Sequence, residues 1–120
     1  MILFYNCSGG GYKRMSIEDP ETLLSIQDSL LITNGNDQSI IEALVIAHNN
    51  VAVKYINEGD NVSAVKHYNK ANELNSSDKV SKYGLLITEG RLLVSKGNKN
   101  RIWDAIEKFS EASTLYPNNG

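Results

Sequence analysis

Residues 64–71 read AVKHYNKA, and residues 105–112 read AIEKFSEA. Each stretch carries an alanine, an aromatic residue and a second alanine at spacings of four and three, which places the three on one face of an α-helix. The small residues allow another helix to approach closely, and the aromatic ring fills the space left between successive helices. The recurrence of this stripe predicts a repeated helical unit.

The sequence before each stretch also repeats. A turn glycine precedes both, Gly59 in one case and Gly97 in the other. Before each glycine, a helical segment carries a small residue followed three positions later by a large one: Ala52 and Tyr55, then Gly90 and Leu93. The chain therefore contains two related units, at about residues 45–78 and 83–119.

Start and stop signals along the chain predict about five helices. Asp19, Pro20 and Glu21 form a typical helix start, and Gly35 marks the end of that helix. No segment shows sustained alternation with a period of two, so the expected fold class is all-α. The predicted helices cover about residues 19–32, 37–57, 62–74, 78–96 and 101–115.

The first 18 residues differ from the rest, because no helical period begins before Asp19. The run Gly9-Gly10-Gly11 allows wide backbone freedom. The sequence therefore predicts a flexible N-terminal tether over residues 1–18 and a helical domain over residues 19–120.

The two units together resemble the tetratricopeptide repeat. The unit 45–78 has the 34 residues of that family's period. The second unit carries extra residues at 99–101, inside its turn, and ends on the proline-containing sequence of residues 116–119. The chain departs from the family's pattern at His48, Asn72, Ser76 and Glu89. The resemblance implies an α-solenoid of antiparallel helix pairs, preceded here by an extra N-terminal helix.

In that family the first helices of successive pairs line a concave groove, which binds an extended peptide or a partner helix. Carried over by position, the groove consists of Ile46, Asn49, Val53, Ile56, Asn57, Ile87, Arg91, Val94 and Ser95, with Gly84 beside them. Only Arg91 in this set is cationic, so the form of the family that grips a carboxylate with several lysines is disfavoured. The implied partner is another protein or peptide.

Composition argues against several other functions. The formal net charge is −2, and clustered basic residues of the kind that bind nucleic acid are missing. No apolar stretch reaches the roughly 20 residues that cross a bilayer. His48 and His67 have no carboxylate at ligand spacing. We therefore expect no enzyme activity, no metal and no cofactor.

A second interpretation concerns Cys7, the single cysteine. Residues 3–11 look like the end of a bacterial lipoprotein signal, in which the cysteine is lipidated and a Ser/Gly tether follows. That interpretation requires an apolar run upstream of Met1. It would make the chain a lipid-anchored scaffold of the cell envelope. The sequence is compatible with both locations, the cytoplasm and the bacterial envelope. It is also compatible with the chain being a fragment of a longer repeat array.

Overall fold

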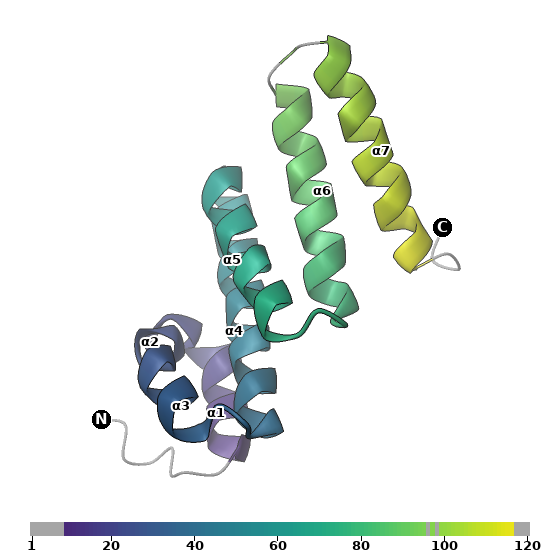
Figure 1. The fold of residues 1–120 in the computed structure, drawn as a ribbon. Helices are drawn as coiled ribbons and strands as arrows, with labels where there is room; N and C mark the ends of the chain where they lie inside the picture. Colours follow the sequence, from purple (N-terminus) through teal and green to yellow (C-terminus); the bar gives the residue numbers. More distant parts are fainter. Residues whose placement is uncertain (1–8, 96, 98, 117–120) are drawn as a thin grey trace.

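The computed structural model describes residues 9–95, 97 and 99–116, and within them the fold is helical without strands. This confirms the predicted all-α class. The molecule is elongated, with principal extents of 52 × 28 × 25 Å (Figure 1). The helices are α1 (Gly9–Glu18), α2 (Pro20–Ser25), α3 (Gln27–Asn34), α4 (Gln38–Asn57), α5 (Asn61–Leu74), α6 (Lys79–Ser95) and α7 (Lys99–Leu115).

The helices pack mainly with their neighbours in sequence. The largest contacts are those of α5 with α4 and of α7 with α6, and α5 also packs against α6. The three short helices α1, α2 and α3 gather at one end of the molecule, around α4 (Figure 1). At that end Met15, Leu23, Leu30 and Leu44 belong to one buried cluster.

The two repeated stretches bury the face that their spacing predicts. Ala64 and Ala71 are fully buried, and Tyr68 between them is 5% exposed. Ala105 and Ala112 are buried in the same way on α7, and Phe109 is partly buried.

Two glycines on α6 leave room for the rings of Tyr68 and Phe109. A Cβ atom on Gly84 would lie 2.4 Å from the ring of Tyr68, and one on Gly90 would lie 2.5 Å from the ring of Phe109. Only glycine therefore allows the rings to sit where they do.

The predicted tether over residues 1–18 is wrong for its second half. Residues 9–18 form α1, which packs along α4 and buries Met15 to 1% exposure. Glycines lower intrinsic helix propensity, but burial of apolar side chains against a neighbouring helix can outweigh that cost. Cys7 lies outside the described residues.

The predicted helix over residues 19–32 is interrupted at Ile26. Its backbone leaves the helical region, with φ −111° and ψ 10°, so α2 ends there and α3 begins. The side chain of Ile26 packs against the buried cluster at this end of the molecule. Together with α1, this break gives seven helices in the described residues rather than about five.

The four longer helices agree with their predicted ranges to within a few residues, and aspartates cap three of them. Asp37 accepts a hydrogen bond from the Ser39 amide at 2.9 Å, and Asp60 accepts one from the Ser63 amide at 3.0 Å. Asp78 caps α6 in the same manner. The turn glycines Gly59 and Gly97 have φ values of 84° and 68°, as their positions after helices require.

Candidate functional site

The predicted groove residues differ widely in exposure. Val53 is 47% exposed and Val94 is 48% exposed, although both are apolar. The residues most open to solvent are Val53, Asn57, Arg91, Val94 and Ser95, whereas Ile46, Ile56 and Ile87 are half-buried. On α4, these residues follow one another at spacings of three and four, so they share one face of the helix.

Two positions carried over to the groove take part in helix packing instead. Ile56 packs against the buried cluster of Ala52, Ala64 and Tyr68. Gly84 lies against the ring of Tyr68, which a larger side chain would displace. Both residues therefore contribute to the packing between helices, which leaves only part of the Ile56 side chain available to a ligand.

A pocket of about 430 Å³ opens at the N-terminal half of α4. It includes two of the predicted groove residues, Ile46 and Asn49, and extends to the turn between α5 and α6. Its volume lies within the range of about 300–1,000 Å³ that small-ligand sites occupy. The lining residues are Gln38, Ile41, Glu42, Val45, Ile46, Asn49, Asn50, Asn75, Asp78 and Val80.

Asn49 is the most unusual residue of this pocket. The residue is only 9% exposed, and its side-chain amide nitrogen donates to Asp78 Oδ2 at 3.4 Å. Its Oδ1 atom is buried and accepts no hydrogen bond from the described residues. A buried acceptor without a donor costs about 1–3 kcal/mol, so a donor brought to this oxygen would be stabilising.

Asp78 is held firmly in place beside Asn49. Its Oδ2 atom accepts hydrogen bonds from the amide of Ser81 at 2.9 Å and from the Ser81 hydroxyl at 2.6 Å. These are the hydrogen bonds of a helix N-cap. Because Asp78 caps α6, its carboxylate has a fixed position at the pocket. Nothing in the local sequence pattern indicated that this cap would lie against α4.

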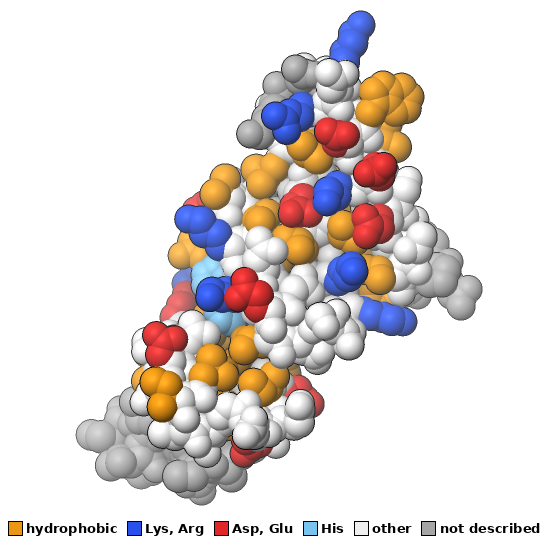
Figure 2. Space-filling model, in the orientation of Figure 1, with side chains coloured by type: hydrophobic (Ala, Val, Ile, Leu, Met, Phe, Trp, Pro, Cys, Tyr) orange, Lys and Arg blue, Asp and Glu red, His pale blue; other side chains and the backbone are white. Residues whose placement is uncertain are grey.

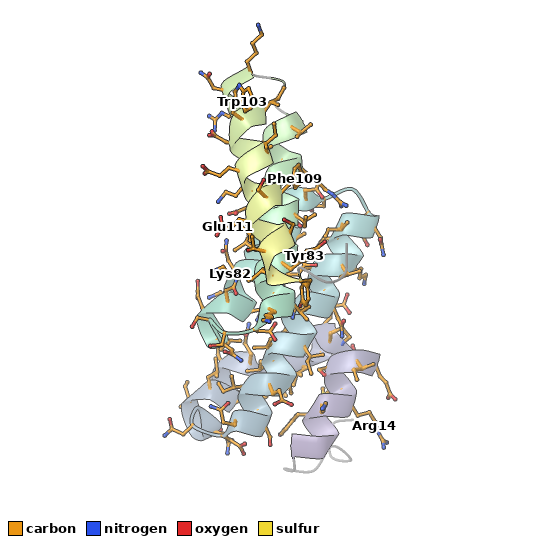
Figure 3. The ribbon with its side chains drawn as sticks, turned by 90° about the vertical axis from the view of Figure 1, so that its right-hand side faces the viewer. Arg14, Lys82, Tyr83, Trp103, Phe109 and Glu111 are labelled. Carbon is orange, nitrogen blue, oxygen red and sulfur yellow. The ribbon has the colours of Figure 1, made fainter. Side chains whose placement is uncertain are left out.

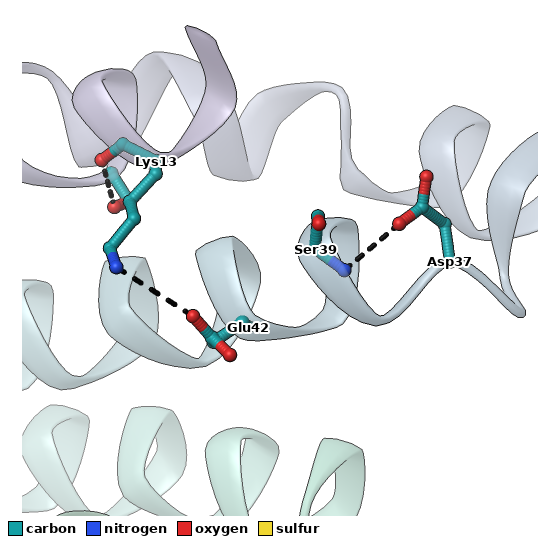
Figure 4. A network of polar contacts seen from close by, with 5 residues as sticks. Lys13, Asp37, Ser39 and Glu42 are labelled. Carbon is teal, nitrogen blue, oxygen red and sulfur yellow. Dashed lines mark hydrogen bonds and ion pairs between the residues drawn. The ribbon is translucent and has the colours of Figure 1, made fainter. Parts of the chain in front are cut away.

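The other side of the pocket adjoins α1. Lys13 of α1 approaches Glu42 of α4 to 3.7 Å, close to the start of α4 (Figure 4). Farther along, Asn50 Nδ2 donates to the backbone carbonyl of Ser16 at 3.0 Å. Two pocket side chains are thus engaged by a helix that the sequence does not predict.

A second polar cluster lies between α3, α4 and α5. His48 and His67 have their Nδ1 atoms 3.0 Å apart, and His48 Nε2 lies 2.9 Å from Gln27 Oε1. Because the Gln27 oxygen can only accept, His48 donates from Nε2 and accepts from His67 through Nδ1. The ring of His67 also stacks on Tyr55.

Burial sets the protonation of these histidines. Burial, followed by the charges of His67 and Lys70, lowers the pKa of His48 to about 4. Burial also lowers the pKa of His67. Both rings are therefore neutral at pH 7 and link three helices. His48 is thus a buried packing residue, 2% exposed, and His67 is half-buried against it.

On the face drawn in Figure 2, no single sign of charge dominates. Figure 2 shows acidic and basic side chains interspersed over α6 and α7. Trp103 is 72% exposed near the end of the molecule opposite Arg14 (Figure 3). Among the described residues, no three or more His, Cys, Asp or Glu side chains are grouped so as to hold a metal ion.

No helix within the described ranges has the length and apolar character needed to cross a membrane. Comparisons with models of protein families, with curated proteins and with solved structures gave no match to this chain.

Proposed function

We propose that this chain is a non-catalytic protein-interaction module that holds a peptide segment along α4 and α6. The proposal includes the finer architecture implied by the sequence: α4–α5 and α6–α7 are two successive antiparallel helix pairs of a tetratricopeptide-type α-solenoid. The packing of Tyr68 on Gly84 supports this, since an aromatic of the first pair fills space beside the first helix of the second.

The observation that carries the proposed function is the exposure of apolar side chains on the first helix of each pair. Val53 and Val94 keep 47% and 48% of their surface in water, yet neither belongs to the stripes that pack the helices together. Burying them against a peptide would contribute about 25 cal/mol for each Å² removed from water. Partly exposed Ile46 and Ile87 extend this apolar surface, and Asn57, Arg91 and Ser95 supply polar contacts.

The test begins with selection of binding peptides from a random displayed library on the immobilised full chain. Affinity of a selected, fluorescently labelled peptide is then measured by anisotropy. The variant Val53→Asp with Arg91→Glu should weaken binding at least tenfold, because it places acid on the apolar surface and removes the cation. Its helical signal and melting temperature should stay close to those of the original protein.

A matched control makes the same chemical changes on α5. Val62→Asp with Lys66→Glu also replaces an exposed valine and an exposed cation, and Val62 is 56% exposed. This control should leave the peptide affinity within about twofold. If the α5 control loses the peptide and the α4–α6 variant keeps it, the groove assignment is wrong. A selection that enriches no peptide also contradicts the proposal.

A further inference from the structure

The pocket at the N-terminal half of α4 presents acceptors without matching donors. Asn49 Oδ1 is buried with no hydrogen bond from the described residues. Two side-chain amide nitrogens on the same stretch of α4 are already engaged: Asn49 Nδ2 with Asp78, and Asn50 Nδ2 with the Ser16 carbonyl. A ligand that satisfies Asn49 must therefore bring its own N–H or O–H group.

The acidic lining of the pocket favours a cationic ligand. Glu42 and Asp78 line it, and its lining contains neither lysine nor arginine. Lys13 reaches Glu42 from α1 at 3.7 Å, but both side chains of that pair are more than half exposed, so their attraction is weak. Asp78 keeps its carboxylate in position through the cap on Ser81. The complementary group is a cation that carries several N–H donors.

The apolar part of the lining suits the stem of such a group. Ile41, Val45, Ile46 and Val80 contribute aliphatic surface beside the acceptors. Lysine and arginine combine an aliphatic stem with a charged, donor-bearing head, and they bury the stem while the head makes polar contacts. An acidic or purely apolar side chain would leave Asn49 Oδ1 unsatisfied and Asp78 unpaired.

We propose that this pocket binds a lysine or arginine side chain of the peptide segment that the module holds, with the cationic head beside Asn49 and Asp78. The inference rests on the proposed function, because Ile46 and Asn49 belong both to this pocket and to the predicted groove. It specifies the chemistry of the partner: a segment with a basic residue adjacent to the apolar residues that cover Val53 and Val94.

The test uses small probes, so that it does not depend on a selected peptide. N-acetyl-arginine amide and N-acetyl-lysine amide are titrated into the labelled full chain, and two-dimensional NMR spectra record the backbone and Asn side-chain amides. N-acetyl-citrulline amide, which has the shape of the arginine probe without its charge, serves as the comparison. The basic probes should bind saturably and at least tenfold more tightly than citrulline, with the largest shifts at residues 38–50 and 75–80.

Two capping aspartates provide matched variants. Asp78→Asn keeps an N-cap residue on α6 but removes the carboxylate, and it should weaken the basic probes at least tenfold. Asp60→Asn makes the same change at the cap of α5, outside the pocket, and should leave the affinity within twofold. Asn49→Ala should weaken binding as well, because the open acceptor is gone.

Equal affinity for arginine and citrulline probes, or unchanged binding by Asp78→Asn, overturns the inference. The two proposals fail separately. If binding of a selected peptide depends on Val53 and Arg91 but the basic probes do not bind, the pocket proposal is wrong and the groove proposal is supported. If the probes bind through Asp78 but the selection enriches no peptide, the cation-binding pocket is supported and the proposed function is wrong.

Discussion

His48 and His67 lie on different helices, 19 positions apart in the chain, with 3.0 Å between their Nδ1 atoms. Gln27 accepts a hydrogen bond from the other ring nitrogen of His48, and among the described residues no acid is hydrogen-bonded to either ring. Burial penalises the charged form of His48 and lowers its pKa, so the folded arrangement favours the neutral ring.

This relationship predicts that the fold loses stability in mild acid. The pKa of His48 is about 4 in the folded protein and about 6.5 when the ring is exposed, so the unfolded chain takes up the proton first as the pH falls. The contribution is fully present above about pH 6.5 and is lost as the pH falls towards 4. Between pH 7 and pH 5, the free energy of unfolding should fall by on the order of 1–2 kcal/mol.

Urea denaturation at several pH values measures this effect. His48→Gln removes the ring with the larger shift and leaves only His67 to titrate, so it should show a flatter dependence between pH 7 and pH 5, whatever its stability at pH 7. The depressed pKa values of Glu21 and Asp60 affect stability only below about pH 4.5 and do not interfere. Equal slopes for the two proteins would contradict the prediction.

The contact between Gly84 and Tyr68 predicts an unusual response to alanine. In an exposed helix Gly→Ala stabilises by about 1 kcal/mol. At Gly84 the added Cβ would lie 2.4 Å from a nearly buried ring. Such overpacking typically costs about 1–3 kcal/mol, so Gly84→Ala should destabilise the protein. Combining it with Tyr68→Leu should recover part of the loss, which a double-mutant cycle of denaturation midpoints would measure. Additive effects of the two changes would refute direct contact.

The buried alanines of the two repeated stretches should not accept larger side chains. Ala64 is 0% and Ala105 is 1% exposed, so Ala64→Leu and Ala105→Leu should each lower the free energy of unfolding by about 1–3 kcal/mol. Lys66→Ala, at an exposed site on α5, should change it by less than about 0.5 kcal/mol. Indistinguishable denaturation midpoints for the three variants would mean that the buried face is assigned incorrectly.

The packing of α1 makes Met15 part of the core. Because Met15 is 1% exposed, Met15→Ala should cost about 2–5 kcal/mol, as for other large buried residues. The neighbouring exposed residue Arg14 provides the control, and Arg14→Ala should be nearly neutral. Thermal or chemical unfolding measures both. A Met15→Ala variant as stable as Arg14→Ala would indicate that residues 9–18 do not pack against α4.

The sequence by itself determined the all-α class, the ranges of the four longer helices and the buried stripes at Ala64, Tyr68 and Ala71 and their counterparts on α7. These features depend on interactions within a helix: a spacing of three and four, a capping aspartate, a glycine with positive φ. Such signals lie within a few residues of one another, so they can be read along the chain.

The tertiary structure alone decided the features that join distant segments. Helix α1 forms from a glycine-rich segment because it packs against α4 and buries Met15. No local sequence pattern indicates this contact. The turn that carries Asp78 lies against Asn49, and His48 contacts His67. Both contacts depend on the particular alignment with which α4 and α5 pack. Packing free energy and side-chain hydrogen bonds between helices outweigh local propensity at these positions, and these long-range contacts also create the candidate pocket.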